Sequence, residues 1–318
     1  MYRRRRNTQN RYGGNSNRFG FRFKIILVSV IVIAAVSAFI TGAALSSRAD
    51  KSSYESFGRQ NLTSFGGVER PEADYAALGE IKADYVNTSG VDRQSFKSAV
   101  ADADDADAVA FKVNDESGSL FFAPESPVKD KLSFGVLSTV TAKELAEVCE
   151  DYTKISVAYF YSAALGEQSG ELRVLKSAEE LAVISELAAA GINEIAIFGV
   201  PDETDLLSSV SPYLAWAESL CERTNICVVL AEDDVKGTGA TRIISATQGY
   251  ADAYAIDFSR VPNVELGDMI ERCAYFLTQY NMRVIVADAE EEIRAETLAI
   301  LESYGIKSYE FIGAEQIS

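Results

Sequence analysis

Short segments rich in β-branched and aromatic residues alternate with amphipathic segments from residue 80 to the end of the chain. The former predict eight strands, at Ile81–Asn87, Asp107–Val113, Ile155–Tyr161, Glu194–Phe198, Ile226–Ala231, Ala253–Phe258, Arg283–Ala287 and Lys307–Ile312. The latter predict seven helices, at Arg93–Ala103, Ala142–Tyr152, Ala178–Ala190, Pro212–Arg223, Thr241–Gly249, Glu265–Tyr280 and Glu290–Tyr304. Strict alternation of strands and helices is typical of a parallel sheet with right-handed crossover connections.

The number of repeats favours a closed sheet. Eight strands within the 239 residues of 80–318 match the size of a (β/α)8 barrel, which is normally about 250 residues. We therefore predict an α/β fold, a TIM-type (β/α)8 barrel whose last helix is reduced to Gly313–Ser318. The alternative is a doubly wound open sheet, but no Gly-x-Gly-x-x-Gly motif follows the first strand.

Local signals predict helix ends and one loop structure. The Ser-Ala-Glu-Glu sequence at 177–180 predicts a capping box at the start of the third helix. Gly191 and Gly305 follow two expected helices and predict left-handed residues there. The longest connection, between the second strand and the second helix, holds two apolar pieces that predict a hairpin over the barrel mouth, at 120–122 and 134–136.

A basic segment and a long uncharged segment precede the predicted barrel. Residues 1–24 contain eight arginines and lysines and no acidic residue, and the 21 residues of 25–45 carry no charge. As a helix, the uncharged run spans roughly 30 Å, the thickness of the hydrocarbon core of a membrane. Basic flanking residues stay cytoplasmic. We therefore predict a basic cytoplasmic tail (1–24), a transmembrane helix (25–45), a stalk (46–79) and an extracytoplasmic barrel (80–318).

This prediction makes the chain a single-pass protein of the cell membrane with its N-terminus in the cytoplasm. The alternative is a cleaved signal peptide, but the apolar core of such a peptide is usually ~7–15 residues. The membrane is thus one expected partner, and a polysaccharide or an envelope protein is the other. The net charge of −17 excludes nucleic-acid binding as the main role.

The chain contains no histidine. This excludes Ser-His-Asp and Cys-His nucleophilic sites and zinc sites that need histidine ligands. The four cysteines form no Cys-x-x-Cys motif, so we expect neither a metal nor a cofactor. Cys221 and Cys227 lie six residues apart and allow a disulfide, with small buried thiols as the alternative.

Acidic residues follow several of the predicted strands. In a (β/α)8 barrel the active site lies at the C-terminal ends of the strands, so these acids converge on one rim. Glycoside hydrolysis requires two carboxyl groups that face each other across a sugar, one of them kept protonated, and it requires no histidine. The candidate catalytic pair is Glu232 with Asp257 or Asp288.

Other strand ends offer candidate substrate-binding residues. Lys112 and Asp115 follow the second strand, and Tyr159 and Tyr161 end the third. Each of these residues also has a structural alternative. Acids after strands cap helix N-termini, Lys112 can form a buried ion pair with Asp257, and the two tyrosines can simply pack.

The stretch VAFKVNDESG at 109–118 resembles the second strand of a family of glycoside-hydrolase-like (β/α)8-barrel domains in bacterial secreted or membrane-anchored proteins. Tyr85-Val86 and the residues 250–252 also fit, and the similarity in order and spacing extends from about residue 80 to the C-terminus. The resemblance implies a barrel in a carbohydrate context. Its pattern carries over to Asp115 and Gly118.

The chain also departs from the pattern of this family. Lys112 stands where the family has an acid, and 194–201 lacks the acid and the arginine of the family's fourth strand. Tryptophans of the family's last two strands are absent as well. We therefore expect a divergent member that binds a glycan or an envelope partner without catalysis. The alternative is an active glycosidase on a cell-envelope or extracellular polysaccharide.

Overall fold

The computed structural model describes residues 81–313 with the exception of 104, 126–134, 169, 222 and 289–290. Three predicted segments lie outside the described residues: the basic tail 1–24, the transmembrane helix 25–45 and the stalk 46–79. Of the predicted reduced helix Gly313–Ser318, Gly313 ends the last strand and 314–318 also lie outside the described residues. Within the described part of the chain, no helix is both long enough and apolar enough to cross a membrane.

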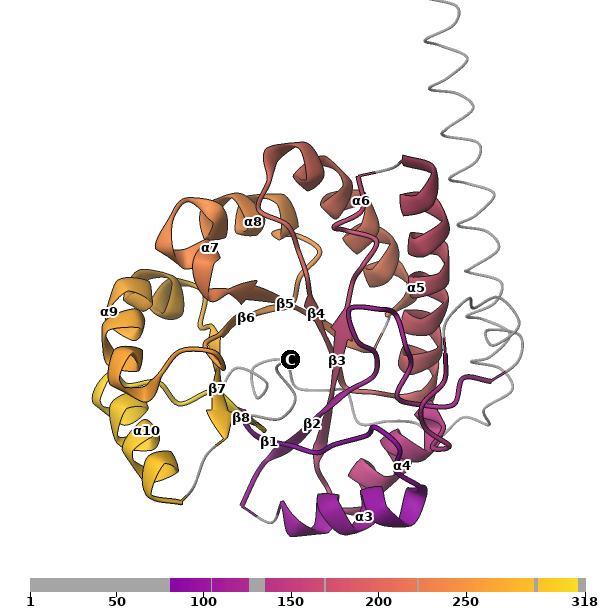
Figure 1. Cartoon of the computed structure of the whole chain (residues 1–318), viewed down its shortest axis with the longest axis horizontal. Helices are drawn as coiled ribbons and strands as arrows, with labels where there is room; N and C mark the ends of the chain where they lie inside the picture. The colour runs from indigo at the N-terminus through magenta and orange to yellow at the C-terminus, as the bar shows by residue number, and fades with distance from the viewer. Residues whose placement is uncertain are drawn as a thin grey trace, which may run out of the picture. The chain divides into compact units, whose positions relative to one another are not determined.

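Eight parallel strands follow one another around a closed barrel, and helices surround them (Figure 1). The strands are β1 (Lys82–Tyr85), β2 (Ala108–Lys112), β3 (Ile155–Tyr161), β4 (Glu194–Phe198), β5 (Asn225–Ala231), β6 (Ala253–Asp257), β7 (Arg283–Asp288) and β8 (Tyr309–Gly313). The helices are α3 (Arg93–Asp102), α4 (Ala142–Asp151), α5 (Gly170–Ala190), α6 (Thr204–Leu220), α7 (Glu232–Lys236), α8 (Gly239–Thr247), α9 (Asn263–Gln279) and α10 (Glu291–Ser303). Because β1 pairs with β8, the predicted barrel is confirmed and the open sheet is excluded.

The strands separate two layers of buried side chains. Successive residues of a strand point to opposite faces, so alternate residues line the barrel interior. Many of these interior residues are small, for example Ala83, Ala110 and Ala196. Large side chains such as Phe111 and Phe160 point outward and pack under the helices, and each contributes roughly 1.5–3 kcal/mol by its burial.

The helix α5 begins earlier than the sequence predicts. The capping box predicted at 177–180 is wrong, because these residues lie inside the helix. The side chain of Glu180 accepts hydrogen bonds from the Ser162 hydroxyl (2.7 Å) and from the backbone N–H of Ala164 (2.8 Å). This glutamate therefore ties α5 to the loop after β3 instead of capping a helix.

The other local predictions have mixed outcomes. Gly191 and Gly305 have φ values of 95° and 70°, which confirms left-handed residues after α5 and α10. The predicted hairpin is wrong, because Leu120 forms a parallel bridge with Val136, and a hairpin needs antiparallel pieces. All four cysteines are buried free thiols, so the disulfide alternative is excluded.

Candidate functional site

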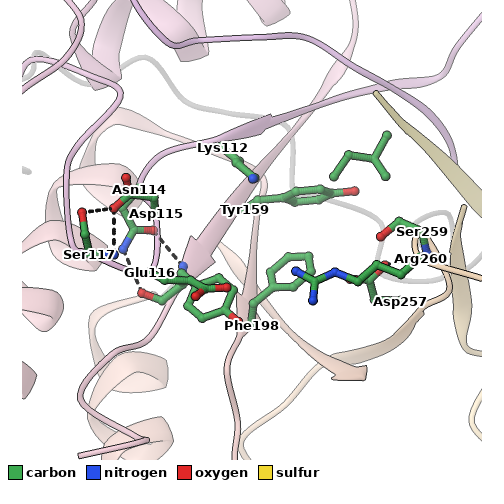
Figure 2. Close-up of a pocket in the computed structure, with 12 residues that line it drawn as sticks. Lys112, Asn114, Asp115, Glu116, Ser117, Tyr159, Phe198, Asp257, Ser259 and Arg260 are labelled. Carbon is green, nitrogen blue, oxygen red and sulfur yellow. Dashed lines mark hydrogen bonds between the residues drawn. The ribbon is translucent and has the colours of Figure 1, made fainter. Parts of the chain in front are cut away.

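A pocket of about 220 Å³ opens at the carboxyl ends of the strands, the end at which barrels of this type hold their active sites. Strands β2, β3, β4, β6 and β8 and the loops after β2 and β6 supply the side chains that line it (Figure 2). These residues are Lys112, Asn114, Asp115, Glu116, Ser117, Tyr159, Tyr161, Phe198, Asp257, Ser259, Arg260 and Ile312. We call this cavity the mouth pocket.

One side of the mouth pocket is aromatic. The rings of Tyr161 and Phe198 are nearly parallel, with centroids 6.3 Å apart and an interplanar angle of 13°. The ring of Tyr159 lies 4.9 Å from that of Phe198 and is tilted by 56°. These three residues, the aromatic wall, come from adjacent strands β3 and β4. They present flat apolar surface to a ligand.

The remaining lining is charged and polar. Lys112 and Asp257 are the last residues of β2 and β6, and Arg260 projects into the pocket from the loop after β6 (Figure 2). Asp257 accepts a hydrogen bond from the backbone N–H of Ser259 (2.9 Å), which orients its carboxylate. Cationic donors and anionic acceptors thus line one small cavity, a combination that suits a ligand rich in hydroxyl groups.

The surroundings of Lys112 depress its basicity. Burial lowers the pKa of this amine below its usual value, and the positive charge of Arg260 acts in the same direction. The carboxylates of Asp115, Glu116 and Asp257 oppose this effect. Asp257 has the smallest influence on this pKa, so the predicted structural Lys112–Asp257 pair does not dominate the environment of the amine.

The loop after β2 is fixed to the end of β3 by Asn114. Its side-chain amide donates to the Tyr161 carbonyl (2.8 Å), and its carbonyl accepts from the Tyr161 N–H (2.7 Å). This arrangement brings Glu116, which lines the same pocket, close enough to Tyr161 for its carboxylate to act on the phenol. Burial raises the pKa of Tyr161, and the Glu116 carboxylate raises it further.

Asp115 shapes the same loop. Its Oδ1 accepts hydrogen bonds from the backbone N–H of Ser117 (2.9 Å) and of Ser119 (3.0 Å) and from the Ser117 hydroxyl (2.6 Å). Gly118 adopts a left-handed conformation with φ of 86°, which glycine adopts without steric cost. The two residues that carry the family resemblance therefore build a turn at the pocket edge.

The floor of the mouth pocket rests on buried charges. The Tyr159 hydroxyl donates to Glu310, and Glu310 forms an ion pair with Arg283. Arg283 also binds both carboxylate oxygens of Glu194, at 2.7 and 2.8 Å. We call these four side chains the interior cluster; each is at most 3% exposed. Burial raises the pKa of Glu310, although Arg283 opposes the shift.

The structure brings together five of the seven site residues predicted from the sequence. Those that line the mouth pocket are Lys112, Asp115, Tyr159, Tyr161 and Asp257. The other two do not line it. Glu232 begins α7 and forms an ion pair with Lys236 (2.9 Å), and Asp288 forms one with Arg294 (3.2 Å). The predicted pairing of Asp257 with either acid across one pocket is therefore not present.

Strand alternation explains why Asp288 is elsewhere. Asp257 shares the inward face of β6 with the buried interior residue Ala255. Asp288 is three residues beyond the inward-facing Ile285 of the same strand, so it points toward the helices, as the parity of the sequence predicts. Glu232 lies beyond the end of β5, as the first residue of α7, so strand parity does not place it.

Several pocket residues escaped the sequence prediction. Glu116, Ser117, Ser259 and Arg260 lie on loops, where strand periodicity no longer applies. The only available signal was their position two to five residues after Lys112 and Asp257, the inward-facing ends of predicted strands. Phe198, by contrast, is predictable as the inward-facing end of β4.

The described residues contain no group of three or more His, Cys, Asp and Glu side chains that could hold a metal ion. The mouth pocket presents amine, guanidinium, carboxylate and phenol groups.

No family model matches this chain, and no curated protein matches it. A protein provisionally assigned as an alpha-L-fucosidase, from Bacteroides thetaiotaomicron, shares the fold with a TM-score of 0.54 and 11% identity, over 78% of this chain and 91% of its own. The comparison also finds an alpha-L-fucosidase from Lactobacillus casei, with a TM-score of 0.46 and 9% identity over 76% of this chain and 92% of its own. It finds a sugar phosphate isomerase/epimerase from Parabacteroides distasonis, with a TM-score of 0.46 and 12% identity over 76% of this chain and 90% of its own. The likeness to the first of these proteins, at 11% identity, establishes a shared barrel fold alone.

Proposed function

We propose that the mouth pocket binds a single sugar unit, such as the end of a glycan chain, without cleaving it. The observation that carries this proposal is the aromatic wall facing charged hydrogen-bonding groups inside one small cavity. The C–H face of a sugar ring can lie against Tyr161 and Phe198. Its hydroxyl groups can then donate to Asp257 and accept from Lys112 and Arg260.

The size of the pocket supports a small ligand. Its volume of about 220 Å³ is below the roughly 300–1,000 Å³ typical of pockets for drug-sized molecules. A pocket of this size suits one ring rather than several units of a polymer. A pocket that holds one ring is expected to bind the end of a glycan chain rather than an internal stretch of it.

The positions of the acids support binding rather than hydrolysis. A glycosidase needs two carboxyl groups facing each other across the sugar, and neither Glu232 nor Asp288 lines the pocket with Asp257. The Asp115 carboxylate is engaged by its own turn.

Isothermal titration calorimetry tests the proposal with the purified full-length chain and a panel of neutral, amino and acidic monosaccharides. We expect at least one sugar to bind, and Asp257→Asn to weaken its binding about 10- to 100-fold, because a hydrogen bond to a charged group contributes about 1.5–3 kcal/mol. Glu232→Gln is the matched control and should bind like the wild type. No binding by any sugar, or equal losses in both variants, would contradict the proposal.

The alternative, an active glycosidase, has one observation in its favour. Three carboxylates, those of Asp115, Glu116 and Asp257, line the mouth pocket. Release of the aryl group from a panel of aryl glycosides tests this alternative. Turnover that is lost in Asp257→Asn and in Glu116→Gln, but kept in Glu232→Gln, would favour the enzyme over the binding protein.

We also propose that residues 25–45 anchor the chain in the cell membrane, with the mouth pocket outside and available to envelope glycans or envelope proteins. The supporting observation is the uncharged 21-residue run after a tail with eight basic residues. Membrane fractionation and protease treatment of intact cells test this topology. Recovery of the full-length chain in the soluble fraction would contradict it.

A further inference from the structure

Lys112 occupies a distinctive place in the mouth pocket. It is the last residue of β2 and shares the inward face of that strand with Ala108 and Ala110. Lys112 is half-buried, and its side chain lines the cavity (Figure 2). In the strand register it is paired with Tyr159 of β3. A primary amine is therefore held by a rigid strand at the wall of a small pocket.

The groups around this amine suit it to nucleophilic chemistry. Burial and the nearby guanidinium of Arg260 favour the neutral form of Lys112, which is the form that attacks a carbonyl carbon. Glu116 and Asp257 line the same pocket and can accept and return a proton. In a protein without histidine, carboxylates such as these are among the side chains that can perform such proton transfers.

We propose that Lys112 condenses with the carbonyl group of a small hydroxy-aldehyde or open-chain sugar and holds it as an imine. The choice of a sugar carbonyl rests on the proposed function. The reaction itself requires only that a carbonyl compound enter the mouth pocket.

The step balances without any further reactant. A carboxylate of the pocket takes one proton from the Lys112 ammonium, and the amine lone pair attacks the carbonyl carbon while the C=O π electrons move to oxygen. The nitrogen of this adduct gives up a proton as the oxygen gains one, which yields a neutral carbinolamine. Its hydroxyl then takes the proton held by the carboxyl group and leaves as water. The C=N bond forms, and the product is a protonated imine plus one water molecule.

Reductive trapping tests this proposal. The full-length chain is incubated with glyceraldehyde and sodium cyanoborohydride, which reduces imines to stable amines, and labelled lysines are identified by peptide mass spectrometry. The label adds the mass of glyceraldehyde minus one oxygen atom. We expect Lys112 to be labelled at least about tenfold faster than the exposed Lys143, because the pocket holds the aldehyde beside the amine.

Two variants sharpen the test. Lys112→Arg keeps the positive charge but forms no imine, so the fast label should disappear while Lys143 is labelled as before. Glu116→Gln should slow the labelling of Lys112 several-fold, because one proton-transfer group is lost. Labelling of Lys112 at or below the rate of Lys143 in the wild type would overturn the proposal.

The outcome is separable from that of the sugar-binding proposal. Sugar binding by calorimetry without fast labelling of Lys112 would leave the binding function in place and remove the imine. Fast labelling without binding of any sugar would support a reactive lysine and remove the sugar as its ligand.

Discussion

At the scale of single residues, the interior cluster shows how a charge is kept inside a barrel. Arg283 is 3% exposed and pairs with Glu194 and Glu310, which are fully buried. The Arg283–Glu194 contact uses two parallel N–H···O bonds, the strongest geometry for such a pair. Removing one member leaves its partners as uncompensated charges in the buried interior.

The interior cluster leads to a first prediction. Arg283→Met should lower the free energy of unfolding by about 3–5 kcal/mol, because two buried carboxylates lose their cation. Arg242→Met is the matched control. This variant removes the ion pair between Arg242 and Asp202, whose side chains are 41% and 38% exposed. It should lower the free energy of unfolding by at most about 1 kcal/mol. Urea titration measures the free energy of unfolding of both variants. Equal decreases in the two variants would contradict a stabilising role of Arg283 in the interior cluster.

A second residue predicts pH-dependent stability. Glu186 is 7% exposed, and burial raises its pKa to about 8 from 4.5. Its Oε1 accepts the Glu125 N–H (2.8 Å), whereas its Oε2 has no hydrogen-bond partner among the described residues. Between the two pKa values the folded state holds a proton that the unfolded chain releases. The contribution of this group to stability is therefore present below pH 4.5 and is lost as the pH rises toward 8.

We expect Glu186→Gln to reduce this loss. Between pH 5 and pH 8 the wild type should lose up to about 4 kcal/mol more unfolding free energy than the variant. Urea titrations at both pH values measure the difference. Other buried carboxyls titrate in both proteins, so the comparison isolates Glu186. Identical pH slopes in the two proteins would refute its assignment as the titrating group.

At the scale of elements, the loop after β4 contacts the aromatic wall directly. Gly199 has a φ of 78°, and a Cβ atom placed there would lie 3.1 Å from both the Ser162 carbonyl oxygen and the Tyr161 ring. Gly305 has a similar φ of 70°, but a Cβ atom there would have no neighbour within 4 Å. The two glycines share a backbone requirement and differ in what surrounds them.

This contrast predicts a split between stability and binding. Gly199→Ala and Gly305→Ala should each cost about 1–2 kcal/mol of unfolding free energy, because an L side chain is disfavoured at positive φ. Only Gly199→Ala should also weaken sugar binding, because it displaces Tyr161. Thermal unfolding and calorimetry measure the two effects. Unchanged affinity in Gly199→Ala would show that Tyr161 does not contact the ligand.

At the scale of the whole molecule, the fold buries all four thiols, Cys227 inside the barrel and the other three between the barrel and its helices. Each cysteine is buried and free, and burial raises the pKa of Cys149 to about 12 and that of Cys273 to about 11. The thiolate is the reactive form of cysteine. The folded chain should therefore protect its cysteines both by enclosure and by keeping them protonated.

A thiol titration tests this protection. We expect Ellman's reagent to react with four thiols per chain in denaturant and with almost none in the native protein. A reducing agent should leave the thermal midpoint unchanged, because no disulfide constrains the described residues. Rapid reaction of any thiol in the native state would indicate that the barrel opens locally.

Particular residues show what sequence reasoning could reach. Lys112 and Asp257 end predicted strands on their inward faces, so their meeting in one pocket follows from the barrel. Asp288 ends a strand on its outward face and pairs with Arg294 of the next helix. Glu232 begins α7 and pairs with Lys236 of that helix. Arg260 belongs to a loop, whose path no periodic pattern describes.

The amino-acid order alone determined the eight strands with helices between them and, through strict alternation along each strand, which side chains share a face, because these features depend on neighbours in the chain. Only the tertiary structure decided that β1 meets β8, that Arg283 lies between Glu194 and Glu310, and that loops bring Glu116 and Arg260 to the mouth pocket. These contacts join residues far apart in sequence. Their geometry depends on closing and packing the whole barrel at once.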